Sequence, residues 1–123
     1  MLSRMDSVNL LLIGHEAAAQ EFLDPLLSSL PSPVIFFDGA TPALPDGPVG
    51  TLVVRDVAEM TPSHQHQFLA WLTAESGSAR IITISARSLY ERVERREFSE
   101  RLYYRLNTVV VPLSPVASHI GTA

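Results

Sequence analysis

Two acidic residues and two histidines are spaced closely enough in the sequence to suggest chemistry. Asp56 and Glu59 follow an apolar run, and paired carboxylates at a strand end can act as general acid and base. His64 and His66 resemble a metal pair, but residues two apart on a helix diverge by about 200°. Zinc ligands on one helix are usually four residues apart. We therefore expect a structural role for the two carboxylates and no metal site.

Two residue types are missing altogether. The 123-residue chain has no cysteine, which excludes disulfides, thiol catalysis and cysteine-ligated metal sites. It also has no lysine, because all nine basic residues are arginine. Schiff-base chemistry and a phosphate-binding P-loop lysine are therefore both excluded.

Charge is distributed unevenly along the chain. Residues 1–79 hold nine acidic residues and two arginines, a net charge of −7, whereas residues 80–123 hold seven arginines and four glutamates, a net charge of +3. The overall charge of −4 argues against general affinity for nucleic acid. The arginine-rich part is either a solvated helical face or a surface that meets the acidic part of a neighbouring copy.

Composition predicts one globular domain. Hydrophobic residues make up 46% of the chain and charged residues 18%, which is enough apolar material for a core. The longest apolar runs hold about five residues, and a membrane-spanning helix needs about 20. The N-terminus has no long apolar signal-peptide core. We expect a cytoplasmic protein without membrane contact.

Apolar runs alternate with helical segments, which predicts a parallel sheet with helices on both faces. Thr61 and Pro62 are typical of the N-cap and first residue of a helix, and Gly77 is expected to end that helix. Pro25 either kinks its helix or makes it restart. The predicted strands cover 8–13, 34–37, 51–54, 80–84 and 108–113, and the predicted helices cover 16–29, 61–75 and 89–106, the last in two pieces around 97–98. Residues 1–7 are an expected N-terminal extension and 114–123 a flexible tail.

Five segments together resemble one protein family, the AAA+ domain of sigma-54-dependent transcription activators. Residues 98–107 read FSERLYYRLN and precede an apolar strand ending in PL, as in the family pattern F-R-x-D-L-Y-Y-R-L-N-V. Residues 50–60, GTLVVRDVAEM, resemble its Walker B line G-T-L-F-L-D-E-I-x-E-L/M. The remaining matches are 61–72 with the following helix [S/L]-P-x-x-Q-x-x-L-L-x-x-L, 80–89 with the sensor I strand, and 11–21 with the Walker A line L-L-x-G-E-S-G-T-G-K-E.

The resemblance implies a three-layer αβα fold of the P-loop NTPase type over residues 8–113. It further implies a five-stranded parallel sheet in which the strand at 8–13 lies between those at 108–113 and 80–84, followed by 51–54 and 34–37. The family's helical lid, regulatory domain and DNA-binding helix-turn-helix have no counterpart in this chain. Residues 38–49 are too few for the family's GAFTGA loop, so we expect no direct sigma-54 contact loop.

The resemblance also implies that the ATPase chemistry has decayed. Gly14 matches the first P-loop glycine, but Ala17 and Ala19 replace the later ones and Gln20 replaces the lysine. A P-loop needs glycines so that its backbone N–H groups can wrap the phosphates, and a lysine to reach the outer ones. Gln20 is neutral and cannot substitute for that positive charge.

The Walker B and sensor positions have changed too. Arg55 replaces the metal-supporting aspartate, Asp56 replaces the catalytic glutamate, and Ala86 replaces the sensor asparagine. We expect Arg55 to pair with Asp56 or Asp38, or else to bind an anion. We therefore expect a degenerate AAA+ module that is not an enzyme and has no cofactor, with vestigial nucleotide-binding residues Gly14, Gln20, Glu21 and Asp56.

If ATP is not hydrolysed, the function implied by the resemblance is binding to another protein. Of two arginines that the family offers to a neighbour's nucleotide, one is Ser99 here and the other remains as Arg105. With Arg101, it could instead meet the acidic, empty site of another copy. We therefore predict an interaction module whose protein partner is a second copy or a homologous AAA+ activator. A nucleotide-binding, non-hydrolysing sensor and a domain with an unrelated acquired role are the alternatives.

Overall fold

A computed structural model describes residues 9–40, 43–47, 49–75, 79–106 and 109–113. The expected N-terminal extension at 1–7, the tail at 114–123 and the helix stop at Gly77 lie outside these residues.

A parallel five-stranded sheet forms the centre of the domain. Its strands, in chain order, are β1 (Leu10–Ile13), β2 (Val34–Asp38), β3 (Thr51–Arg55), β4 (Arg80–Ser85) and β5 (Val109–Pro112). Their spatial order is β2-β3-β4-β1-β5, with every pairing parallel. The predicted order is confirmed, and β1 is an interior strand as expected.

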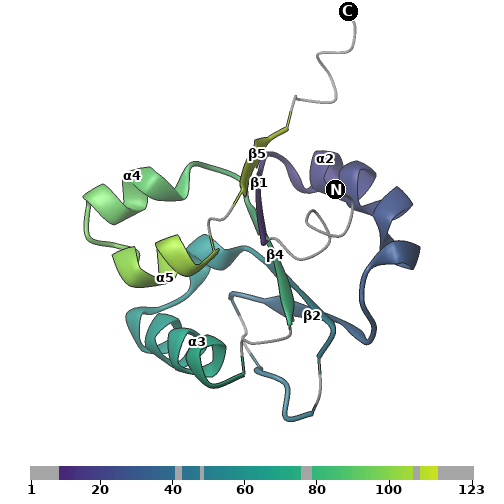
Figure 1. Ribbon diagram of the computed structural model, residues 1–123. Coiled ribbons are helices and arrows are strands. Elements are labelled where there is room, and N and C mark those ends of the chain that lie inside the picture. Colours follow the sequence, from purple (N-terminus) through teal and green to yellow (C-terminus); the bar gives the residue numbers. More distant parts are fainter. Residues whose placement is uncertain (1–8, 41–42, 48, 76–78, 107–108, 114–123) are drawn as a thin grey trace, which may run out of the picture.

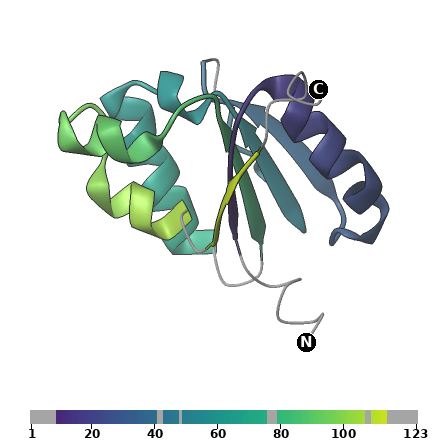
Figure 2. The same ribbon diagram turned by 90° about the horizontal axis from the view of Figure 1, so that it is seen from above.

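Helices cover both faces of this sheet, which confirms the predicted three-layer α/β fold (Figures 1 and 2). One face carries α2 (Glu16–Leu23) and the 3₁₀ segment η1 (Asp24–Ser29). The other carries α3 (Pro62–Glu75), α4 (Leu89–Glu94) and α5 (Glu100–Leu106). A short 3₁₀ turn, η2 (Val57–Glu59), follows β3.

Helix boundaries follow local residue chemistry. The α-helix predicted over 16–29 ends at Leu23 and restarts as η1, with Pro25 in its first turn. Thr61 caps α3 as predicted, since its Oγ1 accepts the backbone N–H of His64 at 3.1 Å. The last predicted helix divides into α4 and α5, because Arg96 adopts a left-handed φ of 63° that ends α4.

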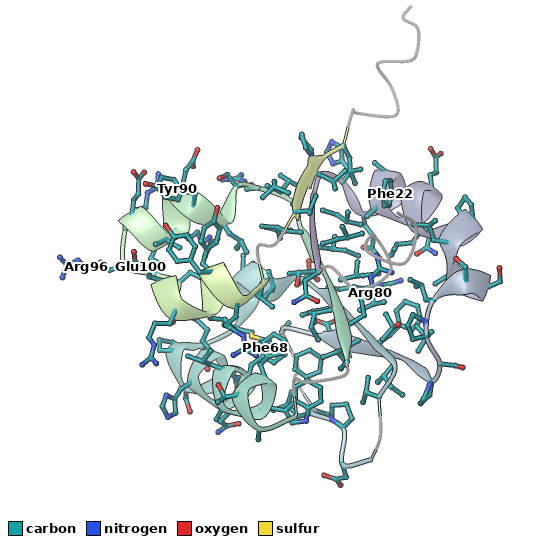
Figure 3. All side chains as sticks on the ribbon, in the orientation of Figure 1. Phe22, Phe68, Arg80, Tyr90, Arg96 and Glu100 are labelled. Atoms are coloured by element: carbon teal, nitrogen blue, oxygen red, sulfur yellow. The ribbon has the colours of Figure 1, made fainter. Side chains whose placement is uncertain are left out.

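Strand alternation places apolar residues on both faces of the sheet. Leu11, Leu52 and Val54 face the cluster beneath α3, α4 and α5. Leu10, Leu12 and Val53 belong to a second cluster beneath α2 and η1. Figure 3 shows Phe68 of α3 and Phe22 of α2 on opposite sides of the sheet. Two buried faces explain why the strands are continuously apolar.

None of the helices in the described part of the chain combines the length and the hydropathy that a membrane span requires.

Candidate functional site

The sequence-predicted site lies at the carboxyl edge of the sheet. Gly14 follows β1, Arg55 ends β3 and Ser85 ends β4, and these parallel strands finish at the same edge. Ligands of open α/β sheets bind in the crevice beyond this edge. Four residues of interest lie at this edge, three from the segment that follows β1 and one from the end of β3, namely Gly14, Glu16, Gln20 and Arg55.

The connection from β1 to α2 is short. Only Gly14 and His15 separate Ile13 from Glu16, where α2 begins, and the N–H of Ala19 donates to the carbonyl of His15 at 2.9 Å. The positions of the two missing glycines, Ala17 and Ala19, are therefore the first turns of a helix. Alanine favours helix over glycine by about 1 kcal/mol per residue, which explains this early start.

Gly14 has a packing role in this structure. Its N–H donates to the carbonyl of Ser85 at 2.9 Å, joining β1 to the end of β4. A Cβ added to Gly14 would lie 2.9 Å from the Cβ of Leu113, which follows β5. The close approach of β5 thus accounts for a glycine at this position without any phosphate.

Arg55 makes the main polar contacts of the site. Its Nη1 lies 3.0 Å from Glu16 Oε2, and its Nη2 donates to Gln20 Oε1 at 3.2 Å. The expected pairing with Asp56 or Asp38 was wrong. Along β3 the side chains alternate, so Arg55 lies on the same face as Val53, the face that α2 covers. The guanidinium also lies over the Phe36 ring, 5.6 Å from its centroid.

Partial exposure limits the strength of the Arg55–Glu16 pair. The two side chains are 37% and 70% exposed, so the pair contributes less than about 1 kcal/mol. The Nε of Arg55 is buried without a hydrogen-bond partner. Gln20 donates through Nε2 to Asp24 Oδ1 at 2.6 Å, which completes a polar chain along α2.

Asp56 follows β3 in a left-handed conformation, with φ 50° and ψ 44°. The N–H of Gly39 donates to the carbonyl of Arg55 at 2.7 Å, and a Cβ on Gly39 would lie 2.2 Å from the Asp56 carbonyl oxygen. Gly39 therefore allows β2 and the turn after β3 to approach closely. The Asp56 side chain is exposed, as is that of Glu21 on α2.

The two candidate interface arginines lie in the helical layer on the far face of the sheet. Arg105 donates through Nη2 to the carbonyl of Leu72 at 2.9 Å, tying α5 to α3. Arg101 is exposed at a hollow between α3 and the α4–α5 connection. Ser99 directly precedes α5 and caps it, because its Oγ accepts the N–H of Leu102 at 3.1 Å.

Three tyrosines form an aromatic cluster on the same helices. The rings of Tyr103 and Tyr104 lie 5.2 Å apart edge to face, and Tyr90 lies 6.0 Å from Tyr103. Burial raises the pKa of Tyr103 above its ordinary value, with a smaller contribution from the charges of Tyr104 and Tyr90. Tyr103 is buried among these helices, whereas Tyr104 is exposed.

Sequence reasoning missed Glu16 as the partner of Arg55. The alignment with the Walker A line places Glu16 inside the P-loop. The helix predicted to begin at Glu16 was the signal that this residue could lie on a helix and reach Arg55. A second feature, a pocket between the turns after β3 and β4, was missed because its residues come from separated segments.

Comparisons with known proteins agree on the kind of domain. The sigma-54 interaction domain family matches residues 3–116. The HTH-type transcriptional regulatory protein TyrR of Enterobacter agglomerans is 28% identical over 82 residues, covering 58% of this chain. The match covers 16% of TyrR, so this chain spans a small part of that relative.

Solved structures share the fold. NtrX from Brucella abortus in complex with ADP superposes with a TM-score of 0.69 at 20% identity, over 89% of this chain and 33% of NtrX. The P-loop NTPase domain of a sigma-54 transport activator from E. coli gives a TM-score of 0.63 at 17% identity, over 94% of this chain and 90% of that domain.

Proposed function

The chain belongs to the sigma-54 interaction domain family, and from that premise we propose that it acts in bacterial transcription regulation as a binding module that does not hydrolyse ATP. It is a sigma-54-activator-like AAA+ domain with the α/β fold of that group. The proposal places it in the cytoplasm, with a protein as its partner. We expect no contact with sigma-54 through the connection from β2 to β3, because residues 39–50 are too few to form the family's contact loop.

The observation that carries this proposal is the contact of Arg55 with Glu16 and Gln20. Mg²⁺ bound to ATP in P-loop enzymes is held near a Walker B aspartate and the P-loop. Here a guanidinium occupies the aspartate position and is neutralised by a carboxylate from α2. A guanidinium cannot ligate Mg²⁺, and its pairing with Glu16 leaves less positive charge to attract phosphate. The protein thus places its own ion pair where the family holds Mg²⁺ and phosphate.

The backbone supports the same proposal. Phosphate binding by a P-loop depends on successive N–H groups that point into an open loop. The N–H of Ala19 is bonded within α2, and only two residues connect β1 to that helix. Without a loop, restoring charge alone does not rebuild a phosphate cradle.

We predict that titration calorimetry with Mg-ATP gives no dissociation constant tighter than about 1 mM. Each lost charge-assisted phosphate contact is worth roughly 1.5–3 kcal/mol, so several losses weaken a micromolar constant by decades. A dissociation constant below about 100 μM would contradict the proposal and favour the nucleotide-sensor alternative.

A charge-restored variant serves as the control for this titration. Gln20→Lys/Arg55→Asp restores the lysine and the aspartate that the family has at these two positions, but leaves the short β1–α2 connection intact. We expect it to bind ATP no better than the wild type. Tight ATP binding by this variant would show that charge, and not the missing loop, was the obstacle.

A module that does not hydrolyse ATP would act by binding another protein, and the arginine-rich segment is the proposed contact surface. The segment 87–105 carries six arginines, of which Arg87, Arg95, Arg96 and Arg101 are exposed. The part of the chain before residue 80 is acidic, so a second copy or a homologous AAA+ activator offers complementary charge. Arg105 is held by Leu72, which leaves Arg101 as the better-placed contact of the two predicted arginines.

We predict that the chain self-associates weakly in low salt and that Arg101→Glu reduces this association. Exposed ion pairs are individually worth less than about 1 kcal/mol, so physiological salt should weaken the contact too. Sedimentation at low and physiological salt measures both effects. Gln67→Glu, an exposed change on α3, is the control because it adds negative charge outside the segment. A wild type that stays monomeric at high concentration in low salt rules out self-association.

A further inference from the structure

A pocket of about 330 Å³ lies between the turn that follows β3 and the turn that follows β4. Because β3 and β4 are adjacent parallel strands, both turns leave the sheet at the same edge. The pocket volume falls at the lower end of the range of roughly 300–1,000 Å³ that is usual for small-molecule sites. Its lining residues are Asp56, Ala58, Glu59, Ser85, Ala86, Arg87 and Arg92.

Internal contacts hold the walls of this pocket, which we call the β3–β4 pocket. Arg92 reaches from α4 and donates through Nη1 to the carbonyl of Ala58 at 3.3 Å, which joins α4 to η2. Ser85 donates through Oγ to the carbonyl of Arg87 at 2.6 Å and so shapes the turn after β4. The N–H of Glu59 donates to the carbonyl of Asp56 at 2.9 Å, which holds the turn after β3. The pocket is therefore formed before any ligand arrives.

Four charged side chains line the pocket without neutralising one another. Two are the carboxylates of Asp56 and Glu59, and two are the guanidiniums of Arg87 and Arg92. In the described part of the chain, none of the four forms an ion pair within 4.0 Å. A ligand with a single charge would meet repulsion from one pair, whereas a ligand with both charges can pair with each.

A metal ion fits this pocket poorly. The described residues contain no group of three or more histidine, cysteine or acidic side chains that could hold one. The two carboxylates alone offer too few oxygen ligands for a divalent cation, and the two arginines beside them repel it.

We propose that the β3–β4 pocket binds a small zwitterion. The cationic group of the ligand lies against Asp56 and Glu59, and its anionic group lies against Arg87 and Arg92. Arginine favours carboxylate as a planar, two-donor partner, so a carboxylate is the anion the pocket suits best. This binding uses no residue of the Arg55–Glu16 pair and does not involve Arg101, although Arg87 and Arg92 also belong to the segment proposed for protein contact.

Calorimetry on the full chain with a panel of L-α-amino acids tests the proposal. N-acetyl amino acids lack the cation and amino acid methyl esters lack the anion, so each set removes one half of the recognition. We expect at least one free amino acid to bind, and both of its blocked forms to bind about 10- to 100-fold more weakly, as expected for the loss of one charge-assisted contact.

Matched variants locate the site. Glu59→Gln and Arg87→Gln change exposed side chains, so both variants should fold. Each should weaken binding of the same amino acid about 10-fold or more, whereas Glu94→Gln and Arg95→Gln, exposed positions outside the pocket, should leave it unchanged. Absence of binding by every free amino acid at about 10 mM overturns the proposal, as does binding that Glu59→Gln and Arg87→Gln leave intact.

Discussion

Phe68→Ala is expected to lower the free energy of unfolding by about 3–5 kcal/mol. Phe68 is fully buried and is the largest of the fully buried side chains in the described residues. Its ring lies 5.5 Å from that of Phe37 on β2 and 6.3 Å from that of Trp71 on α3. Removing it leaves a cavity between α3 and the sheet, which the surrounding strands cannot close. Urea denaturation followed by circular dichroism measures the loss.

Phe36→Ala is the matched control. Phe36 precedes Phe37 on β2 and is 49% exposed, so the same phenylalanine-to-alanine change is made at an exposed position. It should lower the free energy of unfolding by less than about 1 kcal/mol, since most exposed positions contribute little. Equal losses for the two variants would contradict the described packing of α3 against the sheet.

Gln65→Leu is expected to lower the free energy of unfolding by about 2–4 kcal/mol. Gln65 is only 4% exposed, yet its amide is fully used. Its Nε2 donates to the carbonyls of Met60 at 3.0 Å and Glu97 at 3.2 Å, and its Oε1 accepts the N–H of Ser99 at 2.7 Å. Leucine has a similar volume but leaves three backbone groups without a partner.

The same denaturation experiment with Gln67→Leu provides the comparison, because Gln67 is an exposed residue of the same helix. Its effect should lie within about 0.5 kcal/mol of zero. If Gln65→Leu proves neutral as well, the amide does not join α3 to the α4–α5 connection. The family pattern that residues 61–72 resemble has a glutamine at this position, and these three hydrogen bonds give it a structural reason.

Much of the fold could be predicted from local residue chemistry. The apolar runs that became β1, β3 and β4 are buried on both faces, so they lack the polar alternation of a half-exposed sheet. Thr61 and Pro62 marked the start of α3 correctly because capping depends on residues within one helical turn. Strand order came from the family resemblance, which β1 between β4 and β5 confirms.

The site was predicted less completely. Gly14, Gln20 and Arg55 were identified through their alignment with the family motifs, but Arg55 was assigned to Asp56 or Asp38, its neighbours in the strand or across it. Its partner Glu16 lies 39 residues away in the sequence. Which residue Arg55 meets depends on the element that covers its face of β3, and that element is α2.

The sequence by itself determined which chemical groups this protein lacks and which elements it forms. The absence of lysine and cysteine is a matter of composition, and helix and strand formation are decided over a few neighbouring residues. Only the tertiary structure decided that Glu16 neutralises Arg55, that Leu72 holds Arg105, and that four charged side chains from three separate segments line one pocket. Contacts of this kind join residues that are far apart in the chain, so they depend on how the layers pack rather than on any local pattern.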